Sequence, residues 1–149
     1  MGLFDFLKPK KKNISFGIQG SVQEELNHFI FASKAKEMYF QLIEKIKNSP
    51  QASTNDEIDG GIGEFGLEIS NPVPIKTILS NEIYLKQLQT STGREISWER
   101  SGSCSSNNIN HEIDKYQIFG DGKYVIDIYL SPYHYKTSNK APKGFKIIS

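Results

Sequence analysis

The chain has 149 residues, 18 lysines and arginines against 17 aspartates and glutamates, and a formal net charge of +1. This length suits one ordinary domain with its own core, and the near-neutral charge excludes a general polyanion-binding protein, although not a local basic patch. The single cysteine, Cys104, excludes a disulfide framework within the chain, and no apolar run approaches the ~20 residues of a membrane-spanning helix.

Residues 1–12, MGLFDFLKPKKK, form a basic and aromatic segment that we separate from a single domain over residues 13–149. Its lysines follow a very short apolar stretch, whereas a secretory signal places basic residues before a longer one. We therefore expect a cytoplasmic protein. Phe6 stands where a myristoylation motif needs Ser or Thr. Two interpretations stay open: a terminus whose aromatic side chains cover part of the core, or a weak anchor on an anionic membrane surface.

The first third of the chain predicts a strand followed by a long helix. Alternating apolar residues indicate a strand over 13–19. Ser21 and Glu24 then match a capping box. From there, apolar residues at helical spacing predict a helix over about 22–47, which ends before Pro50. Because the apolar surface is wider than one stripe, we expect the middle of this helix to be covered on more than one side.

The remainder of the chain predicts short strands and one short helix. Residues 49–63 are polar and acidic, which is typical of a loop, and alternation at 65–69 predicts a strand. A short helix is expected over about 81–89. Further strands are predicted over 95–100, 113–119, 124–130 and 145–148, with a loop over 101–110, a hairpin turn at 120–122, and Tyr124, Ile126, Ile128 and Leu130 facing inward.

This order of elements predicts the fold class. Strands that cluster late in the chain favour an antiparallel or mixed sheet with helices on one face. We therefore expect an α+β domain in which one long N-terminal helix and a short helix pack on a mostly antiparallel sheet.

Several known catalytic and binding motifs are excluded because their residues do not occur at the required spacing or in the required context. Residues 61–66 match G-x-G-x-x-G, but an acidic loop precedes them and a predicted strand follows, so we interpret them as a turn rather than a dinucleotide site. His134-Tyr135-Lys136 begins like a phosphodiesterase motif, yet Ala141 stands where that motif needs Asp. No metal and no cofactor is predicted, because the candidate ligands are scattered: His28, Cys104, His111 and His134.

Cys104 carries the sharpest enzyme hypothesis. A cysteine thiolate with His111 or His134 as its base would make the protein a small hydrolase or transferase centred on Cys104 or His134. Cys104 lacks a flanking motif, and a lone cysteine in a polar loop is usually incidental. We therefore assign no catalytic residue.

The segment 131–145 is the best candidate site. It has no acidic side chain and combines lysines with aromatic rings, a composition that suits an acidic protein surface, phosphate or, weakly, nucleic acid. The alternative is an ordinary polar loop with Tyr133 and Tyr135 packed on the sheet. The predicted interaction surface consists of Arg100, Tyr133, His134, Tyr135, Lys136, Lys140 and Lys143.

Four short stretches carry a resemblance: Asn71–Ile75, Trp98–Ser103, Ser131–His134 and Lys140–Phe145. Together they make residues 63–147 similar to small uncharacterised bacterial proteins. The resemblance implies a bacterial cytoplasmic protein and assigns no activity or functional residue.

The leading hypothesis is a non-enzymatic interaction module with an accessory or immunity-like role, which binds a protein partner through the sheet edge or the 131–145 segment. Nucleic acid is not expected as the main partner. The partner's identity and the oligomeric state stay open.

Overall fold

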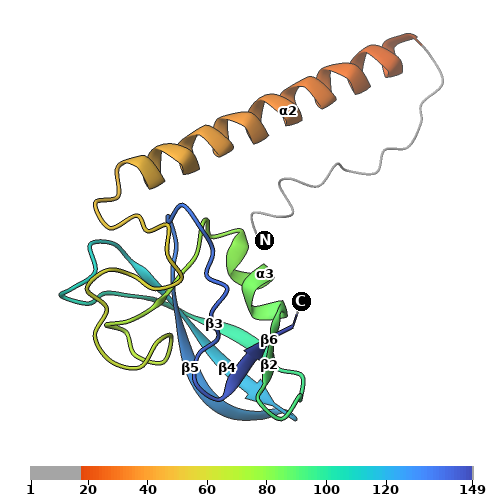
Figure 1. Ribbon diagram of the computed structural model, residues 1–149. Helices are drawn as coiled ribbons and strands as arrows, with labels where there is room; N and C mark the ends of the chain where they lie inside the picture. The colour runs from red at the N-terminus through yellow and green to blue at the C-terminus, as the bar shows by residue number, and fades with distance from the viewer. Residues whose placement is uncertain (1–17, 149) are drawn as a thin grey trace. The chain divides into compact units, whose positions relative to one another are not determined.

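The computed structural model describes residues 18–148 of the chain, which divides into two units, Met1–Glu44 and Lys45–Ser149 (Figure 1). The predicted domain over residues 13–149 thus extends across both units. The predicted boundary at residue 12 lies outside the described residues.

The first unit contains α2 (Ile18–Lys47) as far as Glu44, and the predicted long helix is confirmed. The helix begins earlier than expected, so the predicted strand is wrong for residues 18 and 19; the rest of that strand lies outside the described residues. Helical structure continues through Gly20, since one glycine costs a helix only about 1 kcal/mol. Ser21 consequently lies inside the helix rather than at its N-cap.

The surface of α2 differs from the expected one. In the middle of the helix, Phe29 is 70% exposed and Phe40 is 56% exposed, so the expectation that this region is covered on more than one side is wrong. Periodicity identifies the apolar faces of a helix, but it does not tell how many of them find a partner within the same chain.

The second unit contains two sheets within the described residues (Figure 1). A four-stranded sheet has the order β1-β5-β4-β3, in which β1 is parallel to β5 and the other pairs are antiparallel; a two-stranded antiparallel sheet joins β2 and β6. The elements are β1 (Val73–Pro74), α3 (Ser80–Lys86), β2 (Leu88–Thr90), β3 (Ser97–Cys104), β4 (Ile113–Gly120), β5 (Lys123–Ser131) and β6 (Phe145–Ile147). The α+β class with a mostly antiparallel sheet is confirmed.

The β4–β5 hairpin confirms the clearest strand prediction. Asp121 (φ 52°) and Gly122 (φ 75°) form its two-residue turn, and positive φ at both positions matches the right-handed twist of the strands. Ile128 and Leu130 face the core as expected, but Tyr124 is 55% exposed. Tyr124 lies at the hairpin end of β5, beyond the last strand residues that reach the core, so its predicted inward position is wrong.

Two predicted boundaries shift. β3 continues through Gly102, where a register irregularity and a φ of 136° let the strand pass through a small-residue stretch that predicted a loop. The short helix ends at Lys86 because Leu88 pairs with Ile147.

Residues 65–69 are turns, not the predicted strand. Gly66 has a φ of 75°, which lies in the left-handed region and takes the chain out of the extended conformation of a regular strand. Gly66 is also a point of close approach: an added Cβ would lie 2.7 Å from the Pro142 side chain and 2.9 Å from that of Val73. This turn and the end of the chain therefore pack against the same part of the sheet.

The core of the second unit lies on both faces of the four-stranded sheet. Successive residues of β5 point to opposite faces: Ile128 and Leu130 join the larger cluster with Tyr84 of α3, whereas Tyr129 packs against the smaller cluster around Ile113. The 131–138 segment leaves β5 from the end of this core. Among residues 18–148, no helix is long and apolar enough to cross a membrane.

Candidate functional site

The residues of the predicted interaction surface do not form one patch. Arg100 lies on β3, and β4 separates that strand from β5 and from the 131–138 segment that follows β5. The Arg100 guanidinium donates hydrogen bonds of 2.9 Å to Asp114 Oδ1 and to Ser103 Oγ. The bond to Asp114 raises the pKa of Arg100. Arg100 therefore belongs to a separate polar network on the sheet.

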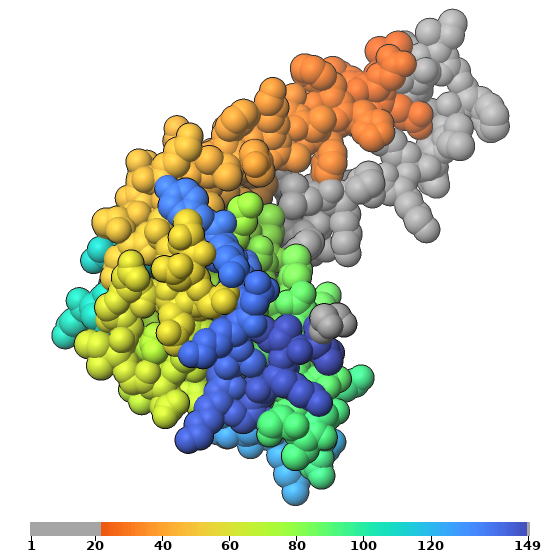
Figure 2. Space-filling view, viewed as in Figure 1, coloured from red at the N-terminus to blue at the C-terminus, as the bar shows by residue number. Residues whose placement is uncertain are grey.

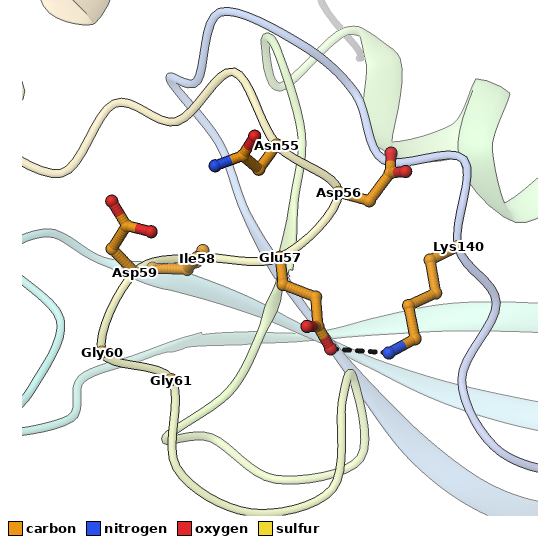
Figure 3. A pocket seen from close by; sticks show the side chains of 8 residues that line it. All are labelled: Asn55, Asp56, Glu57, Ile58, Asp59, Gly60, Gly61 and Lys140. Carbon is orange, nitrogen blue, oxygen red and sulfur yellow. Dashed lines mark hydrogen bonds and ion pairs between the residues drawn. The ribbon is translucent and has the colours of Figure 1, made fainter.

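Two of the predicted lysines are paired with the acidic 49–63 loop. Lys136 Nζ lies 2.8 Å from Asp56 Oδ1, and Lys140 Nζ lies 2.6 Å from Glu57 Oε1 (Figure 3). The Asn139 backbone N–H, 2.8 Å from Asp56 Oδ1, lowers the pKa of that carboxyl, and Lys136 lowers it further. The basic surface expected from the sequence is thus largely neutralised by an acidic loop 80 residues upstream. Lys143 stays exposed.

The acidic loop and the C-terminal segment share one surface. In Figure 2 the yellow residues before position 60 lie beside the blue residues near position 140. An open depression of about 480 Å³ is lined by residues 55–61 and Lys140 (Figure 3). Lys140 Nζ also lies 4.9 Å from the centre of the Phe65 ring. The depression therefore has mixed charge, which does not favour a strongly anionic ligand.

The 131–138 segment has no regular secondary structure beyond Ser131, yet four of its backbone amides bond to distant parts of the chain. Its amides donate to carbonyls of β1, of the residues just after β1 and of the 49–63 loop. These bonds are Tyr133 N–H to Lys76 O (3.2 Å), His134 N–H to Ile75 O (3.0 Å), Tyr135 N–H to Ser53 O (3.1 Å) and Ser138 N–H to Pro74 O (2.9 Å). The segment is therefore fixed by partners 55 to 85 residues away along the chain.

The side chain of His134 lies at the centre of this arrangement with no exposed surface. Its Nδ1 accepts a 3.0 Å hydrogen bond from the Ser53 backbone N–H, and its Nε2 lies 3.0 Å from Ser131 Oγ. Ser131 Oγ in turn lies 2.5 Å from His111 Nε2. Because His134 is buried, it cannot contact a partner, and its place in the predicted interaction surface is corrected: it anchors that surface from below.

The partners of His134 determine the direction of these hydrogen bonds. A ring nitrogen that accepts from an amide carries no proton, so neutral His134 has its proton on Nε2 and donates it to Ser131 Oγ. The Ser131 hydroxyl then donates to His111 Nε2. One chain of donors and acceptors thus connects Ser53, His134, Ser131 and His111, with every bond satisfied.

Both imidazoles are held in the neutral form. Burial lowers the pKa of His134 to about 4, and the neighbouring His111 lowers it as well. Burial also lowers the pKa of His111, which is only partly exposed. Protonation of His134 would place a charge in a site without access to solvent and a proton on the nitrogen that accepts from Ser53. The network therefore matches a neutral, closed structure at physiological pH.

Tyr133 and Tyr135 lie on either side of His134 in sequence. Tyr133 is half-buried and has a φ of 73°, a backbone conformation that residues other than Gly and Asn rarely adopt. Lys45 Nζ lies 4.9 Å from the centre of its ring and donates a 3.3 Å hydrogen bond to its hydroxyl. Tyr135 is 51% exposed. The segment thus buries its histidine and presents two tyrosines at the surface.

The candidate nucleophiles are poorly placed for catalysis. The Ser131–His111 contact resembles a nucleophile and its base, but Ser131 has no exposed surface for a substrate to reach. Burial raises the pKa of the Cys104 thiol, whose Sγ donates to the Ile113 carbonyl at 3.4 Å. A reactive cysteine needs a lowered pKa, so this environment gives the Cys104 hypothesis no support.

The described residues provide no evidence for a metal site or for membrane attachment. Within 18–148, no cluster of three or more His, Cys, Asp or Glu side chains is arranged to hold a metal ion. The membrane-anchor interpretation of residues 1–12 falls outside the described part of the chain and stays a prediction.

Sequence analysis missed the partners that fix the segment. No motif marks Ser53, Asp56 or Lys45. The sequence indicates Ser131 only as part of the 131–145 segment and His111 only as a base for Cys104. The contacts of Ser53 and Asp56 span more than 80 residues, so no local spacing could have identified them.

Comparison with known proteins finds no matching family model, no matching curated protein and no matching solved structure.

Proposed function

We propose that this chain is a non-enzymatic interaction module that binds a protein partner through a tyrosine surface, defined as Tyr133 and Tyr135 with Lys45. The observation that carries the proposal is the anchored backbone of the 131–138 segment: a fully buried histidine lies between two tyrosines, one strained and half-buried, the other exposed. Strained backbone positions persist only where surrounding contacts enforce them, and they concentrate at binding and functional sites.

The energetics of binding favour such a surface. Tyrosine supplies a large, rigid contact area with a polar end, and it is enriched among the residues that dominate binding energy. A segment that is already ordered loses little conformational entropy when a partner binds. The hydrogen bonds made by the Tyr133, His134 and Tyr135 amides fix this backbone in the free protein.

The charges near the tyrosine surface favour a polar or acidic protein partner over nucleic acid. Lys45 contacts the Tyr133 ring and Lys76 is exposed beside it. Lys136 and Lys140 are already paired with carboxylates, so few cations remain for phosphate groups. A partner surface with one or two carboxylates beside an apolar patch would match these features, and an accessory or immunity-like role would require such binding.

A photo-crosslinking experiment with a matched control tests the proposal. A photoreactive phenylalanine derivative replaces Tyr135 in one variant and Tyr124 in the other, within the cells that produce the protein. Tyr124 is 55% exposed and Tyr135 51%, so both probes sample solvent to a similar extent, and Tyr124 lies at the far end of the β4–β5 hairpin.

We expect one protein to be crosslinked in high yield from position 135 and not from position 124. The same protein captured equally from both positions would indicate non-specific encounter. No protein captured from position 135, with the purified variant folded as the wild type, would contradict the proposal.

A further inference from the structure

We propose that α2 pairs with α2 of a second copy of this chain in an antiparallel orientation. The inference shares only Lys45 with the tyrosine surface and does not rest on that proposal. It starts from large apolar side chains of α2 that are exposed to solvent. They are Val22 (60% exposed), Leu26 (49%), Phe29 (70%) and Phe40 (56%), together with Ile30 (43%) and Tyr39 (59%), which lie outside the stripe defined below. Monomeric proteins rarely expose so many apolar side chains on one element, and such patches mark interaction sites.

The spacing of these residues matches a helix–helix seam. Positions 22, 26, 29, 33, 36, 40 and 43 alternate in steps of four and three, which is the a/d pattern of a heptad repeat. We call these positions the α2 stripe. Their residues are Val22, Leu26, Phe29, Ser33, Lys36, Phe40 and Ile43. The stripe is apolar toward both ends and polar at its centre, so a second helix with the same pattern complements it.

Charge complementarity favours a second copy as the occupant. The N-terminal half of α2, residues 18–32, contains two glutamates and no lysine or arginine, whereas residues 33–47 contain four lysines and two glutamates. The two halves thus have formal charges of −2 and +2. An antiparallel pair brings each acidic half against a basic half. It also places the N-terminus of each helix dipole beside the C-terminus of the other, which is favourable.

The polar centre selects the orientation. In a parallel pair in register, Lys36 would face Lys36 of the second copy within the seam, which brings two like charges together. In an antiparallel pair in which each residue number and its opposite number sum to 69, Lys36 faces Ser33 of the second copy. The same alignment places Phe29 opposite Phe40 and Leu26 opposite Ile43, so each end of the seam has two apolar layers.

Sedimentation equilibrium on the full chain provides the first test. We expect the wild type to dimerise reversibly, and the Leu26→Glu/Phe29→Glu variant to raise the dimer dissociation constant at least tenfold. The control, Asn27→Glu/Gln41→Glu, adds the same charge at exposed positions outside the α2 stripe and should change that constant less than threefold. Circular dichroism checks that the helix persists, since glutamate is a good helix former.

A spin label at Gln23 in a Cys104→Ser background tests the orientation. The antiparallel alignment separates the two labels by about 23 residues along the helix axis, or about 35 Å at 1.5 Å per residue. A parallel pair would bring them within about 10 Å laterally, the spacing of packed helices. A short label distance overturns the proposal. So does a wild type that is monomeric up to millimolar concentration, or a dimer that the Leu26→Glu/Phe29→Glu variant leaves intact.

Discussion

The α2 helix is regular in structure but largely exposed, whereas the 131–138 segment is irregular but well anchored. α2 has 30 residues of unbroken helix, yet it leaves several of its largest apolar side chains in solvent. The 131–138 segment has almost no regular structure, yet its central histidine has no exposed surface and its amides bond to distant carbonyls. Local regularity therefore does not identify the best-fixed part of this protein.

The difference has a physical cause. A helix satisfies its backbone hydrogen bonds within itself, so it can form while one apolar face remains exposed to solvent. An irregular segment must find a partner elsewhere for each buried amide. The 131–138 segment finds them on the 49–63 loop and around β1, which makes its geometry a property of the whole second unit.

Among the changes considered, removal of the buried imidazole of His134 should cause the largest loss of stability in the second unit. His134→Ala leaves a cavity, deprives the Ser53 amide of its acceptor and removes the hydrogen bond between His134 Nε2 and Ser131 Oγ. We expect the free energy of unfolding of the second unit to fall by about 2–4 kcal/mol. Urea unfolding followed by the fluorescence of Trp98, which packs against the core, measures the change.

The matched control is Tyr135→Ala, which removes an exposed side chain from the next position. We expect a change within about 0.5 kcal/mol. Equal losses from the two variants would mean that the buried anchor does not determine the stability of the segment.

Acid should weaken the anchored segment almost as strongly. The unfolded chain binds a proton at this imidazole with a pKa near 6.5, whereas burial lowers the pKa of folded His134 to about 4. The stabilisation is complete above pH 6.5 and is lost as the pH falls toward 4, where the unfolded state binds more protons. We expect roughly 3 kcal/mol of lost stability over that range.

Urea midpoints between pH 7 and pH 4 measure this loss, and an NMR titration of the imidazole protons gives the pKa of His134 directly. A folded-state pKa near 6.5 would contradict the closed, neutral network.

Neutralising the paired lysines should have a smaller effect. Lys136→Gln and Lys140→Gln remove ion pairs whose side chains are partly exposed, and surface ion pairs typically contribute at most about 1 kcal/mol each. We expect each variant to lose less than about 1 kcal/mol in the same urea experiment. A loss as large as that of His134→Ala would place the main anchor at the acidic loop instead.

The smallest effect on the stability of the second unit is expected from a substitution in α2. Phe29→Glu changes an exposed side chain of α2, so the unfolding of the second unit should shift by less than about 0.5 kcal/mol. Trp98 fluorescence reports that unit. A large shift would show that the α2 stripe contributes to the stability of the second unit.

The sequence predicted what periodicity and turn chemistry encode. The α2 helix follows from apolar spacing, and the β4–β5 hairpin follows from alternation around Asp121-Gly122. Positive φ at Gly66 turned an alternating stretch into turns, and no alternation pattern reports backbone conformation of that kind.

The candidate site was only partly predictable. Its aromatic and basic composition drew attention to the right segment, and Tyr135 is exposed as an interaction residue requires. The sequence could not show that His134 faces inward or that Asp56 and Glu57 neutralise two lysines. Those facts depend on contacts between residues that are 80 or more positions apart.

The most direct test of the account is the affinity of the partner captured from position 135. Isothermal titration of that purified partner against the wild type, Tyr135→Ala and Tyr124→Ala compares two tyrosines of similar exposure. We expect Tyr135→Ala to raise the dissociation constant at least tenfold, a loss of about 1.4 kcal/mol or more, and Tyr124→Ala to leave it unchanged. Equal affinities for all three proteins would contradict the tyrosine surface as the site of binding.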